Sequence, residues 1–252
     1  MKRQNSCFEW FIKMTIMKKQ IPNIITLLNL FFGCVAITAL LNGYFSIVLY
    51  CFLFSIAMDF ADGFVARLLN VSSPVGKELD SLADMVSFGV VPGMIFYVLL
   101  GGNETTLAEG FSLLNLLPFV GFIFSMLACL RLARFNLDTR QSVDFIGLNT
   151  PTATGFVMGL LMIYQDNTFG LGDFVSQKIF LIPIILLFSY LMISEFPMFS
   201  GKFKGMKWKG NEFRIIFILA ALAEFFLFGY AAFSTIVLTY MILSVIAYFT
   251  KK

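Results

Sequence analysis

The chain has 252 residues, of which 59% are hydrophobic and 13% are charged, and its net charge is +3. Soluble domains contain about 45–50% apolar and about 25% charged residues, so this composition excludes an ordinary soluble domain and indicates an integral membrane protein. No histidine occurs. This excludes histidine-based catalysis and histidine-bound zinc and leaves carboxylates as metal ligands, which select hard cations such as Mg²⁺, Mn²⁺ or Ca²⁺.

The first 20 residues combine five lysines and arginines with apolar residues at helical spacing. This pattern predicts a cytoplasmic arm at residues 1–20, either a short helix lying in the membrane interface or a disordered basic leader. The arm is not expected to be a cleavable signal peptide, because no uninterrupted apolar stretch precedes Ile21.

Eight apolar runs follow the arm, at residues 22–42, 44–62, 80–101, 111–134, 151–165, 178–196, 213–231 and 234–250. Several reach the ~20 residues needed to cross a ~30 Å hydrocarbon core. They predict an all-α, polytopic transmembrane bundle of about eight spans over residues 21–252, with a six-helix core and an additional C-terminal hairpin at 213–250. Seven spans, or six spans with re-entrant pieces, are the alternatives, because the run at 151–165 is short. The hairpin is expected to turn tightly at Ala232 and Phe233.

Basic residues are distributed unevenly between the predicted loops. If the N-terminus is cytoplasmic, 17 of the 18 lysines and arginines lie on that side, and the opposite loops carry Glu104, Glu109, Asp166 and Asp173. This bias satisfies the positive-inside rule. It predicts a multi-pass protein of the cell (inner) membrane with both termini in the cytoplasm. A cluster with Trp208 is predicted to bind anionic lipid headgroups; its lysines are Lys202, Lys204, Lys207 and Lys209.

Four aspartates lie between two apolar runs on the predicted cytoplasmic side. Asp59 and Asp62 are three residues apart, and Asp80 and Asp84 are four apart, so each pair shares one face of a helix. Ionisable groups near bilayer depth are costly and indicate a functional site. If the two helices are neighbours, the four carboxylates converge and repel one another. Divalent cations would neutralise them, and four carboxylates suffice for one or two ions that keep positions open for a substrate.

Smaller residues of this stretch suit a phosphorylated ligand. Gly63 and Gly76 would let a ligand or a neighbouring helix approach the backbone closely. Arg67 can hold a phosphate through two parallel hydrogen bonds. Any single aspartate here is better explained as a charge at a helix end in headgroup water, but the whole spacing is not.

The full pattern, D-x2-D-G-x2-A-R-x8-G-x3-D-x3-D, has eight fixed residue types over 26 positions. It resembles, without departure, the motif of the CDP-alcohol phosphatidyltransferases. The resemblance implies that Asp59, Asp62 and Asp80 bind two divalent ions, Mg²⁺ or Mn²⁺, which engage the CDP diphosphate. It implies that Asp84 is the general base and also touches the second metal. The residues implied to line the nucleotide and its diphosphate are Gly63, Ala66, Arg67, Gly76, Asn23 and Thr26.

Further segments, at 22–30, 80–89 and 131–136, resemble the serine-accepting branch of this family. The segment at 145–151 is similar too, but has Asn149 where that branch usually has proline. The resemblance implies a homodimer that transfers the phosphatidyl group of CDP-diacylglycerol to the hydroxyl of L-serine and releases CMP. Its partners would be these substrates and membrane lipids, with no nucleic acid.

The acceptor site has fewer sequence signals. Arg131 and Arg134 lie three apart at the cytoplasmic end of the fourth run and are candidates for binding the serine carboxylate, with Ser87 and Asn136 as weaker ones. Both arginines are explained equally well as positive-inside anchors or lipid-phosphate contacts.

Three other functions are weighed against serine transfer. The same chemistry with glycerol 3-phosphate or inositol is the nearest alternative, although a phosphorylated acceptor would need more basic residues. A divalent-cation transporter would need ionisable residues in further spans, and the later runs lack them near mid-depth apart from Glu224. A purely structural membrane protein would leave the aspartate motif unexplained.

Overall fold

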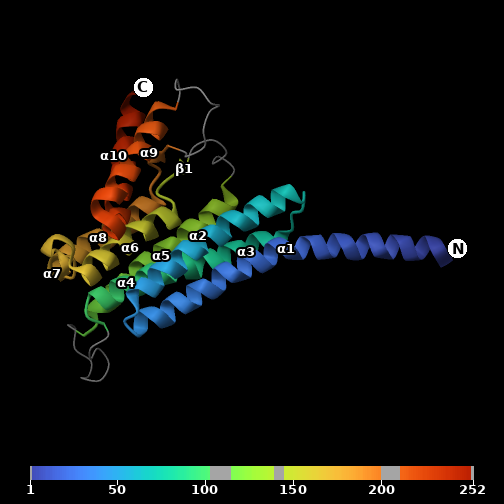
Figure 1. Ribbon diagram of the computed structural model, residues 1–252, viewed down its shortest axis with the longest axis horizontal. Coiled ribbons are helices and arrows are strands. Elements are labelled where there is room, and N and C mark those ends of the chain that lie inside the picture. Colours follow the sequence, from blue (N-terminus) through green and yellow to red (C-terminus); the bar gives the residue numbers. More distant parts are fainter. Residues whose placement is uncertain (1, 103–114, 139–144, 200–210, 251–252) are drawn as a thin grey trace.

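The structure is a computed structural model that describes residues 2–102, 115–138, 145–199 and 211–250 (Figure 1). For residues 2–17, 19 and 145 it describes the backbone alone. Several residues used above therefore lie outside the described part of the chain. They are Glu104, Glu109 and the cluster of Lys202, Lys204, Lys207, Trp208 and Lys209.

The described chain is nearly all-helical, as predicted. Its helices are α1 (Lys2–Leu41), α2 (Phe45–Leu68), α3 (Pro74–Asp84), α4 (Val91–Leu99), α5 (Phe122–Leu137), α6 (Thr150–Asp166), α7 (Gly172–Val175), α8 (Lys178–Ile193), α9 (Glu212–Phe228) and α10 (Ala232–Thr250). A π-helix, Met85–Val90, joins α3 to α4, and 3-10 turns occur at Leu117–Gly121, Thr168–Gly170 and Gly229–Ala231. Two short strands, β1 (Phe145–Ile146) and β2 (Pro197–Met198), pair antiparallel.

Five segments are long and apolar enough to cross a membrane. They are Gln20–Leu41, Phe45–Leu68, Pro74–Leu99, Leu117–Leu137 and Glu212–Thr250, and α8 is a shorter apolar helix. Each of the eight predicted runs contains a helix, while the number of crossings stays a prediction. The last segment consists of α9 and α10 folded back on each other (Figure 1). Its turn falls at Gly229–Ala231 rather than at the predicted Ala232 and Phe233, because Gly229 adopts a φ of 57° that favours glycine.

The arm at residues 1–20 is not a separate element. Its backbone continues without interruption into the first apolar run, so that α1 is a single helix of 40 residues passing through Pro22. In Figure 1 the N-terminal half of α1 extends away from the other helices. The arm is therefore helical but continuous with the first span, and its position relative to a membrane interface stays a prediction.

The helices that carry the acidic motif extend beyond the predicted apolar runs. Helix α2 continues to Leu68, six residues past the predicted end, and α3 begins at Pro74, six residues before the predicted start. Ser73 caps α3, because its hydroxyl accepts a hydrogen bond from the Gly76 amide at 2.9 Å, and Pro74 occupies the first turn, where its missing N–H is not needed. All four aspartates therefore lie within helices.

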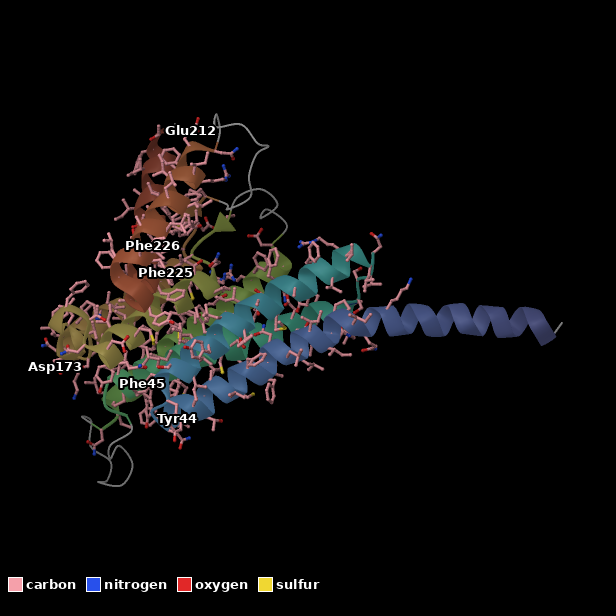
Figure 2. All side chains as sticks on the ribbon, viewed as in Figure 1. Tyr44, Phe45, Asp173, Glu212, Phe225 and Phe226 are labelled. Carbon is pink, nitrogen blue, oxygen red and sulfur yellow. The ribbon has the colours of Figure 1, made fainter. Side chains whose placement is uncertain are left out.

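The run at 151–165, which hydropathy left least certain, forms a largely buried helix. Helix α6 is buried along most of its length and packs against α10 and α4. Gly159 allows this close packing, since a Cβ there would lie 2.9 Å from the Ser234 Cα, and Ser234 Oγ donates a hydrogen bond to the Phe156 carbonyl at 2.8 Å. Small residues permit such approach between membrane helices. The hairpin's outer surface is apolar: Phe226 on α9 is 85% exposed (Figure 2), which suits contact with lipid.

This packing predicts different effects for two glycines of α6. Gly159→Ala should destabilise the protein by about 1–3 kcal/mol, because the added methyl group overlaps the α10 backbone. Gly155→Ala is the matched control, because its Cβ would meet neighbouring atoms only at 3.8 Å. Thermal unfolding of both variants in detergent would check this, and equal midpoints would contradict the packing described for α6 and α10.

Candidate active site

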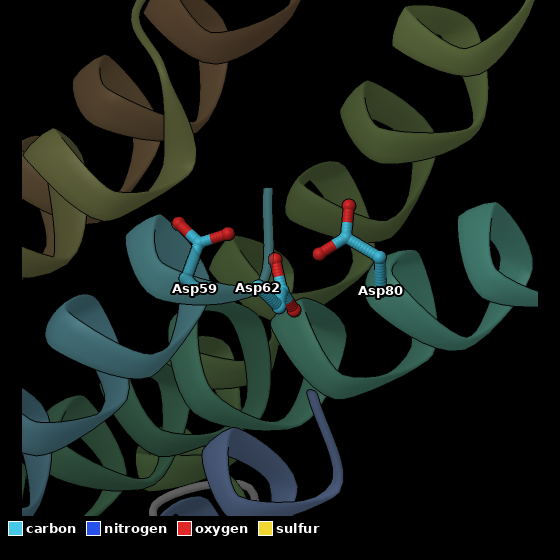
Figure 3. Close-up of side chains that lie close together, drawn as sticks. All are labelled: Asp59, Asp62 and Asp80. Carbon is cyan, nitrogen blue, oxygen red and sulfur yellow. The ribbon is translucent and has the colours of Figure 1, made fainter. Parts of the chain in front are cut away.

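Three of the four predicted aspartates form a cluster between α2 and α3, which both pack against α1. Asp59 and Asp62 of α2 and Asp80 of α3 each direct one carboxylate oxygen toward the same point, and these oxygens lie within 4.8 Å of one another (Figure 3). Asp62 is buried, and the other two are half-buried. We call these three residues the carboxylate cluster.

The carboxylate cluster fits a divalent cation. Asp80 Oδ1 is buried and has no hydrogen-bond partner among the described residues, which leaves a costly polar atom for an ion to satisfy. All the donors are carboxylate oxygens, which suit Mg²⁺ or Mn²⁺. Oxygens bound to one octahedral Mg²⁺ lie roughly 3–4 Å apart, so small side-chain rotations would bring this cluster to that spacing.

The fourth aspartate, Asp84, lies outside the cluster. It follows Asp80 by one helical turn and accepts a hydrogen bond from Asn29 Nδ2 of α1 at 3.0 Å. Asp84 is within electrostatic range of the cluster and of Arg131. The expected convergence of four carboxylates is thus a group of three, with the fourth held separately by an amide.

Helix α1 also contacts the carboxylate cluster directly. The Thr26 hydroxyl donates a hydrogen bond to Asp62 Oδ2, and Thr26 is buried. The resemblance placed Thr26 at the nucleotide, and the structure adds this contact with a predicted metal ligand. Residues that hold metal ligands in place are a regular part of metal sites.

A pocket of about 200 Å³ opens beside the cluster, with Asp62 and Asp80 in its wall. Five of the six residues predicted to line the nucleotide lie along it: Asn23, Thr26, Gly63, Ala66 and Gly76. The sixth, Arg67, has an exposed side chain and does not line the pocket. Sequence reasoning missed the remaining lining residues, which are Pro22, Val71, Ser72, Ser73 and Lys77.

The two glycines of the motif have different roles in this pocket. A Cβ at Gly76 would lie 3.0 Å from Ser73 Oγ and 3.1 Å from Asn23 Oδ1, so glycine there lets α1 and the helix cap approach each other. A Cβ at Gly63 would meet no atom within 4 Å. Glycine at position 63 therefore leaves open space for a ligand.

A second cavity, of about 500 Å³, contains both arginines predicted for the acceptor. Arg131 is buried, donates a hydrogen bond to Thr150 Oγ1 at 2.8 Å, and lies 5.1 Å from the centroid of the Phe135 ring. Arg134 is exposed. Other lining residues are Phe135, Leu137, Asp138, Ile146, Met192, Ile193, Ser194 and Glu195. The short β1–β2 ladder brings the segments around Ile146 and Glu195 together, and no sequence signal identified that pairing.

The two weaker acceptor candidates do not line this cavity. Ser87 is buried in the π-helix, where its hydroxyl donates to the Asn29 carbonyl at 3.0 Å. Asn136 ties the end of α5 to α3, because its Nδ2 donates to Ser81 Oγ at 2.7 Å and its carbonyl accepts from Lys77 Nζ at 2.7 Å. Both residues thus have structural contacts near the site.

A helical membrane protein whose carboxylate cluster borders a glycine-lined pocket has the features of a membrane-embedded phosphotransferase. The family model described as CDP-alcohol phosphatidyltransferase matches residues 19–194, which include all four aspartates, the first pocket and all of the second cavity except Glu195. The chain belongs to this family of phosphotransferases. The match ends before the α9–α10 hairpin.

Curated relatives cover most of the chain. The CDP-diacylglycerol–serine O-phosphatidyltransferases of Helicobacter pylori and Bacillus subtilis are 33% and 35% identical to it over 203 and 192 residues. These alignments cover 80% and 71% of this chain, and 80% and 91% of the relatives. The archaetidylserine synthase of Methanothermobacter thermautotrophicus is 30% identical over 186 residues, covering 72% of this chain and 71% of that protein.

Proposed function

We propose that this protein transfers the phosphatidyl group of CDP-diacylglycerol to the hydroxyl of L-serine and releases CMP. One observation carries the proposal: Asp84 interacts electrostatically both with the three aspartates of the carboxylate cluster and with the buried Arg131. A base in this position would be close to a phosphoryl donor at the cluster and to an acceptor whose carboxylate is bound by Arg131. The names of the relatives reported above agree with this acceptor.

The donor would occupy the pocket beside the carboxylate cluster. Its CDP moiety would lie against Gly63, Ala66 and Gly76, with Asn23 and Thr26 of α1 opposite. Asp59, Asp62 and Asp80 would hold two divalent ions, with Asp84 touching the second, and these would neutralise the diphosphate and the departing CMP. Arg67 would have to reach the diphosphate from outside the pocket. The acyl chains would enter sideways between helices.

Asp84 would act as the general base. The serine oxygen would attack the β-phosphorus, so that a new P–O bond forms while the bond to CMP breaks, and the hydroxyl proton passes to the Asp84 carboxylate. Asn29 already occupies one Asp84 oxygen, Oδ1. The other oxygen would therefore receive the proton.

The second cavity suits a zwitterionic acceptor. Arg131 would bind the serine carboxylate, because a guanidinium matches a carboxylate through two parallel hydrogen bonds. Arg131 and Arg134 share the cavity with the carboxylates of Asp138 and Glu195. This mixture of charges favours an amino acid over a phosphorylated acceptor such as glycerol 3-phosphate. A neutral polyol such as inositol would offer no carboxylate for Arg131 to bind.

We further propose the setting in which this reaction occurs. The protein would span the cell membrane several times as a homodimer, with the site facing the cytoplasm, where serine is available. Glu224, the one ionisable residue that favoured a transporter, has a local partner across the hairpin, since its Oε1 accepts a hydrogen bond from Thr239. This contact makes an ion path through α9 and α10 a weaker explanation.

The direct test is an acceptor panel. Purified protein with CDP-diacylglycerol and Mn²⁺ should release CMP rapidly with L-serine and at background rates with glycerol 3-phosphate or inositol. Following CMP and the phospholipid product together distinguishes transfer from hydrolysis. Equal or faster release with another alcohol would contradict the serine assignment while leaving the family unchanged.

The base assignment predicts the behaviour of Asp84→Asn. Turnover should fall by about 10²–10⁴-fold, which is the usual contribution of a general base, while Mn²⁺ still binds the carboxylate cluster in calorimetry. Asp166→Asn is the control, because Asp166 lies at the end of α6 and outside both cavities. Near-normal turnover of Asp84→Asn with metal bound would show that Asp84 is not the base.

The proposed acceptor site predicts that substitutions of the two arginines change the serine KM by different amounts. Arg131→Lys should raise the serine KM about tenfold or more, because lysine cannot keep both the Thr150 contact and paired bonds to a carboxylate. Arg134→Lys should change it less, because that side chain is exposed. Steady-state kinetics with varied serine would check both. An unchanged KM in both variants would remove the arginines from the serine site.

A further inference from the structure

We propose that Asn29 is a positioning residue that orients Asp84 for proton abstraction, an inference that rests on the proposed role of Asp84 as base. Asn29 is fully buried in α1, and its Nδ2 lies 3.0 Å from Asp84 Oδ1. An ionised carboxylate only accepts hydrogen bonds, so the amide must present its N–H₂ group to Asp84. This bond fixes the rotation of the carboxylate and leaves Oδ2 for the substrate.

Two hydroxyl groups hold Asn29 in place from other helices. Its backbone carbonyl accepts hydrogen bonds from Ser87 Oγ in the π-helix at 3.0 Å and from Ser55 Oγ in α2 at 3.3 Å. Gly33, one turn further along α1, lets the π-helix approach, since a Cβ there would lie 3.2 Å from the Ser87 Cα. The donor to Asp84 is therefore set by α1, α2 and the π-helix together. This π-helix directly follows Asp84. Short π-helical segments are common at functional sites.

The amide oxygen of Asn29, Oδ1, indicates that this residue is not optimised for stability. Asn29 Oδ1 is buried and has no hydrogen-bond partner among the described residues. Leaving a buried polar atom unsatisfied costs about 1–3 kcal/mol. A leucine of similar size would avoid this cost if packing were the only requirement. Asparagine at this position is explained by the donor that it supplies to Asp84.

Thr26 and Asn29 of α1 each donate a hydrogen bond to a different aspartate. They are three residues apart and so share one face of α1. Thr26 donates to Asp62, a member of the carboxylate cluster, and Asn29 donates to Asp84. One helix face thus holds a metal ligand and the base in separate hydrogen bonds. Changes at Asn29 should therefore affect proton transfer and leave metal binding by the carboxylate cluster unchanged.

The test combines Asn29→Leu with Asp84→Asn. Asn29→Leu should lower kcat about 10–100-fold, the range seen when a residue that orients an active group is removed. The KM values for both substrates and the Mn²⁺ affinity of the carboxylate cluster from calorimetry should stay within about twofold, since the Asn29 amide donates to Asp84 and not to a member of the cluster. In the Asp84→Asn background, Asn29→Leu should cause no further loss, because the group that it positions is gone.

Two further variants separate positioning from packing. Ser234→Ala removes a buried hydroxyl that donates to the Phe156 carbonyl and belongs to no hydrogen bond of Asn29 or Asp84, and its kcat should fall far less than that of Asn29→Leu. If Asn29→Leu does not fold, Asn29→Ser replaces it, because serine is too short to reach Asp84 and bonds to its own helix instead. The same kcat loss and the same absence of loss in the Asp84→Asn background are then expected.

Each contrary result has one meaning. An unchanged kcat in the Asn29 variant, an equal loss in Ser234→Ala, or a full additional loss in the Asp84→Asn background would overturn the positioning role. Near-normal turnover of Asp84→Asn alone would instead overturn the base assignment in the proposed function. The two failures are therefore distinguishable in a single set of variants.

Discussion

The structure depends on keeping charged carboxylates inside a helical membrane protein. Asp59, Asp62, Asp80 and Asp84 all lie within helices, where burial of an unpaired charge costs several kcal/mol. The contacts around the carboxylates reduce this cost. Helix α1 supplies hydrogen-bond donors to two of the carboxylates, and three are grouped closely enough for a cation to neutralise. The arrangement of α1, α2 and α3 follows from this requirement.

The site consists of two halves, each with its own cavity, and Asp84 interacts electrostatically with both. Helices α1, α2 and α3 form the half with the carboxylate cluster and its pocket, whereas α5, the β1–β2 ladder and the end of α8 line the larger cavity. Arg131 belongs to the second half and attracts Asp84 of the first. In the proposed reaction, donor and acceptor would occupy different cavities and react near Asp84, as group transfer requires.

Hydropathy located the helices of the described bundle except the short α7, which lies between two predicted runs, and it misplaced several helix ends. Helices α2 and α3 extend six residues beyond the apolar runs because a cap at Ser73 and the polar motif itself continue the helix where hydropathy falls. The run at 151–165 was the least certain because of its threonines and glycines. Those small residues let α6 occupy the centre of the bundle, where lipid contact does not require a strongly apolar surface.

The sequence by itself determined the membrane class, the all-helical fold, the family and the four aspartates, because composition, hydropathy and motif spacing are local properties of the chain. Only the tertiary structure showed that Asp84 lies outside the carboxylate cluster and that Ser87 does not line the second cavity. It also showed that Asn29 contacts Asp84 and that Thr150 contacts Arg131. Asn29 and Asp84 are 55 residues apart. Contacts over such distances depend on how helices rotate and pack against one another, which periodicity along a single helix does not encode.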